Sequence, residues 1–135
     1  MRGTLFLLVF TALIASAAST SARSSPPAKS GHDTAVLTYI YSPECSACQL
    51  FDREVGAIYD RTDESLALPI ERVLIDDWQA SRHELVRCAL TDVISTPTFI
   101  QIHDCQELDR ITGFSDAELF WLGVKRMLSR LTTSD

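Results

Sequence analysis

The order of apolar and polar segments predicts an α/β fold with a central mixed four-stranded sheet, in the order β-α-β-α-β-β-α, and helices on both faces. Three observations carry this prediction: strand-like runs alternate with helix-like periodicity, two of the runs are joined by a short turn, and about a hundred of the 135 residues form one patterned stretch. That length is enough for one hydrophobic core and too short for two domains.

Four runs of β-branched and aromatic residues predict the strands. They are AVLTYIY at 35–41, PIERVLI at 69–75, TPTFIQIH at 96–103 and ELDRIT at 107–112. The turn DCQE at 104–107 predicts that the last two strands form a hairpin. The first two are expected to be parallel, because a helical crossover separates them.

Helical periodicity predicts three helices. The first covers about 45–60, where the apolar positions fall on one face, and TDESLAL at 62–68 is read as a polar bend. The capping-box pairs Ser81 with Glu84 and Ser115 with Glu118 predict the starts of the second and third helices. The expected buried stripe of the third helix consists of Phe120, Val124, Met127, Leu128 and Leu131.

The amino-terminal segment predicts export. Residues 1–22 read as a signal peptide, with Arg2 as the only charge, an apolar run at 5–15 and then small residues. The apolar run is shorter than the ~20 residues that a bilayer span needs, which favours cleavage over a membrane tether. Residues 23–33 are polar and rich in Ser and Pro, so we interpret them as a flexible lead-in to a domain at 34–132. We therefore expect a periplasmic protein.

The charge balance narrows the classes of partner. The chain has 12 basic and 18 acidic residues, a formal net charge of −6. A net acidic chain is a poor match for nucleic acid or anionic lipid, so we expect neither as a partner. We expect the protein to be a monomer.

The chemistry is expected at Cys45 and Cys48, which lie where the first predicted strand meets the first helix. A thiolate is the reactive form of cysteine, and backbone N–H groups at a helix start stabilise negative charge. We therefore predict that Cys45 is the more acidic thiol and attacks a partner disulfide. Cys48 lies one turn on and would resolve the mixed disulfide. This chemistry requires no metal or other cofactor.

Three other interpretations of the cysteine pair remain open. The pair could be a purely structural disulfide, or a copper(I) site, since two thiolates suit that soft metal. Structural zinc needs four ligands, and Cys88 and Cys105 are too far apart in sequence to supply a second close pair. The sequence leaves open whether Cys88 and Cys105 are free or joined to each other.

CSAC, followed about fifty residues later by STPTF, resembles the active site and cis-proline loop of the thioredoxin superfamily. FDREVGAIY, PIERVLIDD and ITGFSDAELFWLGVKRML, together with STPTF, resemble the exported thioredoxin-like regulatory proteins of bacterial sulfur-oxidation (Sox) systems. The resemblance implies a thioredoxin-like fold and a cis peptide bond before Pro97. It also implies that the Thr96 backbone and Pro97 bind an extended substrate segment.

The same resemblance implies a role. We expect a thiol-disulfide oxidoreductase that keeps a partner protein's cysteine reduced, the partner being a sulfur-carrier protein and the electron donor a membrane thiol transporter. Two departures from thioredoxins stand out: Tyr39 replaces their buried acid, and Glu44 replaces the Trp before the first cysteine. A disulfide oxidase or isomerase, and a copper-binding or non-catalytic adaptor, are the alternatives.

Overall fold

The computed structural model describes residues 35–81, 88 and 90–132. The expected signal peptide at 1–22, the lead-in at 23–33 and most of the helix expected after Ser81 lie outside the described residues. Within the described part of the chain, no helix has both the length and the apolar character needed to cross a membrane.

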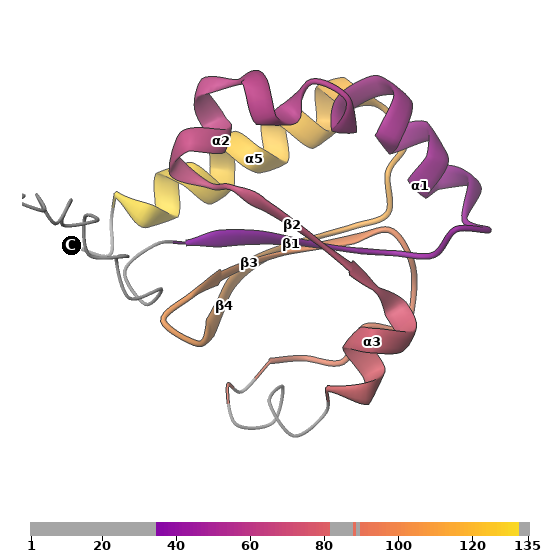
Figure 1. The fold of residues 1–135 in the computed structure, drawn as a ribbon. Coiled ribbons are helices and arrows are strands. Elements are labelled where there is room, and N and C mark those ends of the chain that lie inside the picture. Colours follow the sequence, from indigo (N-terminus) through magenta and orange to yellow (C-terminus); the bar gives the residue numbers. More distant parts are fainter. Residues whose placement is uncertain (1–34, 82–87, 89, 133–135) are drawn as a thin grey trace, which may run out of the picture.

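Four strands form one mixed sheet in the spatial order β2-β1-β3-β4 (Figure 1). They are β1 (Val36–Tyr41), β2 (Ile70–Leu74), β3 (Thr98–His103) and β4 (Gln106–Thr112). β1 pairs in parallel with β2 and antiparallel with β3, and β3 and β4 form the predicted antiparallel hairpin. The predicted sheet, with parallel first strands and a closing hairpin, is confirmed.

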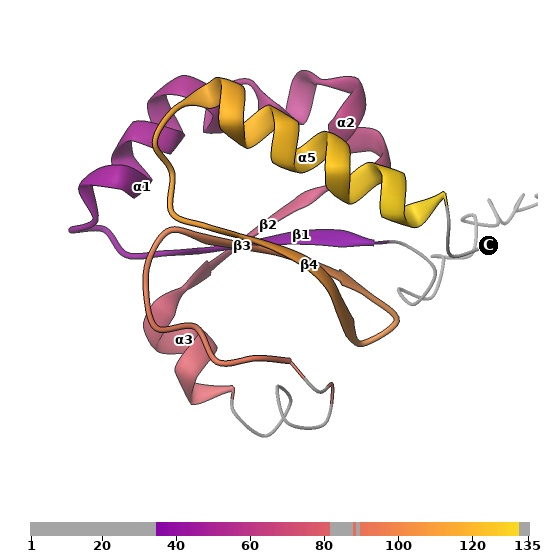
Figure 2. The ribbon, with the colours of Figure 1, turned by 180° about the vertical axis from the view of Figure 1, so that it is seen from behind.

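Helices cover both faces of the sheet, as predicted. On one face lie α1 (Ser46–Phe51), α2 (Asp63–Ala67) and α5 (Ala117–Leu131), and α3 (Ile75–Ala80) lies on the other (Figures 1 and 2). In both views α5 runs along the sheet, with α1 near one end of it and α2 near the other. The crossover from β1 to β2 therefore shares its layer with the last helix.

The first helix is less regular than the prediction of one helix over 45–60. After α1 the chain makes a π turn, η1 (Asp52–Gly56), and then a 3-10 turn, η2 (Tyr59–Arg61). Gly56 is a weak helix former. It also lies under Arg72 of β2, since a Cβ atom at position 56 would come within 2.7 Å of the Arg72 Nη2 atom. The missing side chain lets the strand's arginine pack over this turn.

One other prediction needs correction, and one helix was not expected at all. The segment expected to be a bend at 62–68 contains α2, which begins with two acidic residues that suit a helix start. A second helix that the sequence analysis did not expect, α3, begins at Ile75 directly after β2. The Ser81 N–H donates to the Asp77 carbonyl and ends α3. The helix predicted to start at Ser81 falls on residues outside the described part of the chain.

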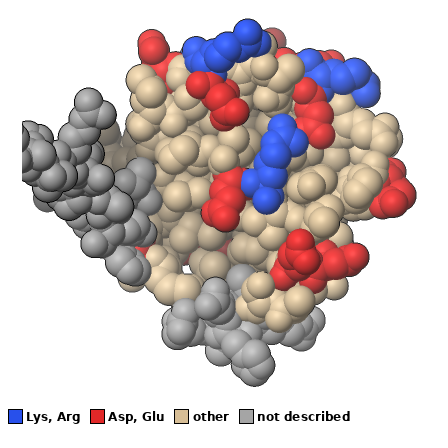
Figure 3. All heavy atoms as spheres, in the orientation of Figure 1, with Lys and Arg blue, Asp and Glu red and all other residues tan. Residues whose placement is uncertain are grey.

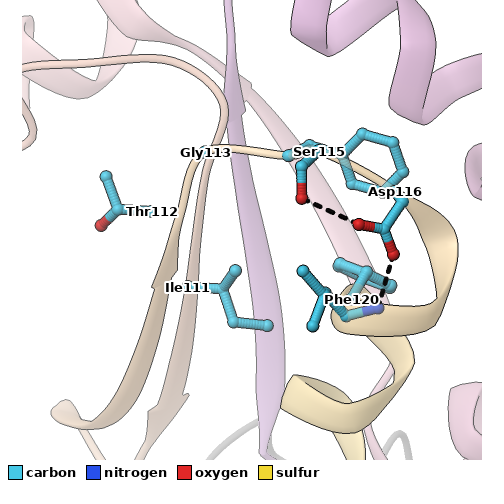
Figure 4. Close-up of a pocket in the computed structure, with 8 residues that line it drawn as sticks. Ile111, Thr112, Gly113, Ser115, Asp116 and Phe120 are labelled. Atoms are coloured by element: carbon cyan, nitrogen blue, oxygen red, sulfur yellow. Dashed lines mark hydrogen bonds between the residues drawn. The ribbon is translucent and has the colours of Figure 1, made fainter.

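The start of α5 is also capped differently from the prediction. The Asp116 carboxylate, rather than the Ser115 hydroxyl, accepts the hydrogen bond from the Leu119 N–H, at 2.9 Å (Figure 4). The Ser115 hydroxyl donates to the same carboxylate at 3.0 Å. The predicted stripe on this helix is confirmed, because Phe120, Val124 and Met127 are buried and Leu128 and Leu131 pack against the core.

The main core lies between the sheet and the α1-α2-α5 layer and is largely aromatic. The ring of Phe51 is at its centre and contacts four other rings, those of Tyr39, Phe99, Phe114 and Phe120. A smaller cluster of Ile40, Trp78, Val93 and Ile100 lies on the α3 side. Tyr39 and Cys48 both belong to this core, and Cys45 packs against it. The aromatic packing therefore holds the cysteine pair in place at the β1-α1 junction.

Candidate redox site

Cys45 and Cys48 are joined by a disulfide where β1 passes into α1, with Cα atoms 5.2 Å apart. Cys45 is the N-cap residue of α1, with extended backbone angles (φ −77°, ψ 110°). The Cys48 N–H donates to the Cys45 Sγ atom at 3.1 Å. An N–H bond to sulfur favours the thiolate form after reduction, which agrees with the predicted assignment of Cys45 as the nucleophile.

The two sulfur-bearing side chains differ in accessibility. Cys48 is only 1% exposed and packs into the aromatic core, whereas Cys45 is half-buried at the surface edge of that core. A partner disulfide can therefore approach through Cys45. Cys48, which is buried, is positioned to react only with a mixed disulfide that Cys45 has already formed.

The predicted substrate residues lie beside the pair. The Cys45 Sγ atom is 3.3 Å from the Thr96 carbonyl oxygen, across 51 positions of sequence. In the reduced protein this is a contact in which the thiol can donate to the carbonyl. The Thr96–Pro97 peptide bond is cis, as the resemblance implied, and the Gly113 N–H donates to the Pro97 carbonyl at 2.8 Å. All four predicted site residues, Cys45, Cys48, Thr96 and Pro97, are therefore gathered in one place.

Tyr39 lies behind Cys48, at the position where thioredoxins carry a buried acid. Its hydroxyl donates to the Cys48 carbonyl at 3.3 Å, and the Asp52 N–H donates to the same oxygen. Burial first, and then the charge of Asp52, raise the pKa of Tyr39 above its ordinary value. At neutral pH the side chain is therefore a neutral hydrogen-bond donor that holds the backbone of Cys48.

An ion pair flanks this tyrosine. Arg72 Nη1 lies 2.8 Å from Asp52 Oδ1, and the Arg72 guanidinium carbon is 5.2 Å from the centre of the Tyr39 ring. The two charged side chains are 41% and 39% exposed, so the pair contributes little to stability. Glu44, where thioredoxins carry Trp, is exposed and accepts a hydrogen bond from the Ser42 hydroxyl. The residue directly before Cys45 is therefore a polar, exposed carboxylate.

The structure joins Cys88 to Cys105, a pairing that the sequence left open. Cys105 lies in the turn between β3 and β4, and the Cα atoms of the pair are 4.7 Å apart. Among the described residues, no group of three or more His, Cys, Asp or Glu side chains is placed to hold a metal ion.

No protein-family model and no curated protein sequence matches the chain. Among solved structures, it is similar to the periplasmic thioredoxin SoxS from Paracoccus pantotrophus in its reduced form. That similarity has a TM-score of 0.60 and 25% identity and covers 72% of this chain and 98% of SoxS.

Two further solved structures that are similar to this chain are also thioredoxins. The Malassezia sympodialis thioredoxin Mala s 13 aligns with a TM-score of 0.57 and 18% identity, over 73% of this chain and 80% of its own. A point-mutant thioredoxin from Halobacterium salinarum aligns with a TM-score of 0.52 and 19% identity, over 71% and 76%. This chain has the thioredoxin fold. Together with the Cys45–Cys48 disulfide, the fold supports thiol-disulfide oxidoreductase chemistry.

A pocket of about 360 Å³ opens on the thioredoxin fold between the end of β4 and the start of α5 (Figure 4). Its lining includes Gly113, whose positive φ of 82° turns the chain from strand to helix. Because the Gly113 N–H is bonded to the Pro97 carbonyl, the pocket borders the cis-proline loop.

Acidic and basic side chains are interspersed on the face of the molecule shown in Figure 3.

Sequence reasoning missed Asp52 as a neighbour of this site. The available signal was its spacing, since Asp52 lies four residues after Cys48 and thus on the same helical face. No comparable signal pointed to Arg72, which reaches Asp52 from β2 and is 20 positions away in sequence. Such a contact depends on the pairing of β2 with β1.

Proposed function

We propose that this protein is an exported thiol-disulfide oxidoreductase that reduces a disulfide in a partner protein. In this proposal residues 1–22 direct export to the periplasm, residues 23–33 are a lead-in, and the domain at 34–132 carries the reaction. The observation that supports it most is the asymmetry of the cysteine pair. Cys45 is half-buried beside the Thr96 carbonyl, while Cys48 is 1% exposed beneath it.

The reaction proceeds in two exchanges. The Cys45 thiolate attacks one sulfur of the partner disulfide, which forms a mixed disulfide and releases the partner's other sulfur as a thiolate that takes up a proton. The Cys48 thiol then loses its proton and attacks the Cys45 sulfur, releasing the partner's second thiol. Two electrons pass to the partner, and the enzyme is left with the Cys45–Cys48 disulfide that the structure shows.

Thr96 and Pro97 form the substrate-binding edge in this proposal. Thr96 precedes β3, which begins at Thr98, so its backbone lies outside the sheet ladder and next to the reacting sulfur. An extended partner segment can pair with it through main-chain hydrogen bonds, which bind whatever the partner's side chains are.

The direction of electron flow and the choice of partner rest on two further observations. The two residues between the cysteines, Ser46 and Ala47, include no histidine of the kind found in strongly oxidising relatives, which favours a reductant. The likeness to a periplasmic thioredoxin supports a periplasmic role. We propose that the substrate is a sulfur-carrier protein with a reactive cysteine, and that a membrane thiol transporter returns electrons to Cys45 and Cys48.

The test is a trapping experiment in the full chain. The Cys48→Ser variant cannot resolve the mixed disulfide, so it should accumulate partners bound through Cys45, seen on non-reducing gels of the periplasmic fraction. The matched control is the Cys45→Ser, Cys48→Ser double variant, which should trap nothing. The absence of any Cys45-linked partner, together with no disulfide-reductase activity of the purified wild type, would contradict the proposal.

Two measurements separate this function from its alternatives. A reduction potential near the ~−120 mV of the strongest known protein oxidants would favour an oxidase over a reductant. Stoichiometric copper(I) binding that is lost in Cys45→Ser, with negligible turnover of disulfides, would favour a metal-binding protein.

A further inference from the structure

The segment that leads into the cis-proline loop is anchored to β4 by the side chain of Arg110. Its Nη1 atom donates to the Asp92 carbonyl at 3.2 Å, and its Nη2 atom donates to the Thr91 carbonyl at 3.0 Å. The same guanidinium forms two hydrogen bonds to the Glu107 carboxylate, at 2.7 and 2.8 Å. Glu107 also accepts from the Thr91 N–H at 3.3 Å. We call Arg110 and Glu107 the β4 clamp.

The β4 clamp is more shielded from water than an ordinary surface ion pair. The side chains of Arg110 and Glu107 are 22% and 17% exposed. Burial by itself would raise the pKa of Glu107, but the hydrogen bonds and the charge of Arg110 outweigh it and hold that pKa below its ordinary value. The clamp is therefore fully charged at neutral pH, and its bidentate, charge-assisted bonds are of the stronger class.

The Cys88–Cys105 disulfide is a second anchor on the same segment. Cys88 lies three residues before Thr91, and Cys105 lies in the turn that joins β3 to β4. The bond closes a ring across a sequence separation of 17 that contains Thr96, Pro97 and all of β3. Such a ring reduces the conformational freedom of the enclosed chain.

The other end of the loop is held as well. The Thr98 hydroxyl donates to the Ser95 carbonyl at 2.8 Å, and the Pro97 carbonyl is bonded to the Gly113 N–H. Between the two ends, Val93 is 3% exposed and packs into the smaller core, whereas Ile94 is 95% exposed. A short stretch at 94–96 is thus presented to solvent by anchors on both sides.

We propose that the β4 clamp and the Cys88–Cys105 disulfide are positioning elements for substrate binding, because they hold the Thr96 backbone where a polypeptide substrate can pair with it. This inference rests on the proposed function. It assigns specificity for polypeptide disulfides over small ones. A polypeptide needs the pre-positioned loop, whereas a small disulfide needs only the Cys45 sulfur.

Single-turnover kinetics test the inference with two probes, insulin as a polypeptide disulfide and 5,5′-dithiobis(2-nitrobenzoic acid) as a small one. The protein is prepared with only Cys45 and Cys48 reduced, which mass spectrometry verifies. Arg110→Gln should raise the half-saturating insulin concentration about tenfold, equivalent to ~1.4 kcal/mol. Its maximal rate, and its rate with the small disulfide, should stay within about twofold of the wild-type values, since the cysteine pair is untouched.

Two further variants and one control sharpen the test. Arg110→Lys keeps the charge but cannot bond Glu107 and both carbonyls at once, so its effect should have the same sign and be smaller. The Cys88→Ser, Cys105→Ser double variant should also raise the half-saturating concentration. The control is Arg61→Gln, which removes an exposed arginine whose guanidinium donates to the Ala57 carbonyl, in the turns that follow α1 and not on β4. It should leave insulin binding unchanged.

Hydrogen exchange gives a readout independent of activity. Amides at 91–96 should exchange faster in Arg110→Gln than in Arg61→Gln, even where both variants have wild-type circular dichroism. An unchanged half-saturating insulin concentration in Arg110→Gln, in a protein whose wild type reduces insulin, would overturn the positioning role and leave the proposed function intact. A wild type that reduces neither probe would overturn the proposed function itself.

Discussion

Replacing Tyr39 with Phe separates two roles for the residue behind Cys48. In the structure the Tyr39 hydroxyl donates to the Cys48 carbonyl, and its pKa lies above the ordinary value because of burial and then the Asp52 charge. A group that holds its proton this firmly is a poor relay at neutral pH. We therefore expect Tyr39→Phe to change stability and to leave the reaction rate almost unchanged.

The magnitude follows from the hydrogen bonds at one oxygen. A net hydrogen bond contributes about 0.5–1.5 kcal/mol, and this one is long, at 3.3 Å. Its removal leaves no buried donor unpaired, and the Cys48 carbonyl keeps its bond from the Asp52 N–H. The expected loss is about 0.5 to 1 kcal/mol in the free energy of unfolding, which lowers the melting temperature by roughly 2–6 °C for a domain of this size.

The assay pairs urea unfolding with single-turnover reduction of insulin at pH 7. Loss of a general acid or base typically costs about 10²- to 10⁴-fold in rate, far from the change within about twofold expected here. A hundredfold slower resolution of the mixed disulfide in a folded Tyr39→Phe protein would refute the reasoning. It would show that the hydroxyl moves a proton in spite of its raised pKa.

Three further expectations concern stability and are checked by urea unfolding. Phe51→Ala removes the ring at the centre of the aromatic core and should cost about 3–5 kcal/mol, so a loss below about 1.5 kcal/mol would contradict the central place given to that ring. Asp116→Ala removes the cap of α5 and should cost about 1 kcal/mol, against no more than a few tenths for Ser115→Ala, which leaves the bond to the Leu119 N–H in place. For Asp109, burial opposes a low pKa but the hydrogen bonds from Arg126 outweigh it, and the pKa lies below its ordinary value. The stability that this carboxylate provides should be complete above about pH 4 and should be lost as the pH falls through the pKa of Asp109 in the folded protein. The difference in unfolding free energy between wild type and Asp109→Asn should therefore shrink on acidification. A difference that does not change with pH would argue against this interpretation.

Local patterns in the sequence determined the strands, their order and the place of the cysteine pair. Alternating β-branched runs, helical stripes and the CSAC spacing are properties of neighbouring residues, and they predicted β1 to β4, the buried face of α5 and the positions of Cys45 and Cys48. Helix boundaries were less determined. The apolar stripe over 45–60 did not reveal the irregular turns that follow Phe51, and Ser81, which the sequence marked as a helix start, is also the residue that ends α3.

Tertiary structure alone decided which distant groups meet. The approach of Thr96 to Cys45, the pairing of Cys88 with Cys105 and the bonds from Arg110 to Thr91 and its neighbour each join positions from 17 to 51 residues apart. Such contacts arise because β1, β3 and β4 are hydrogen-bonded side by side in one sheet, which brings their connecting loops to common edges. The spacing of residues along the chain does not indicate which strands pair. The sequence could therefore predict the reactive cysteines, whereas the residues that contact them could be identified only from the folded structure.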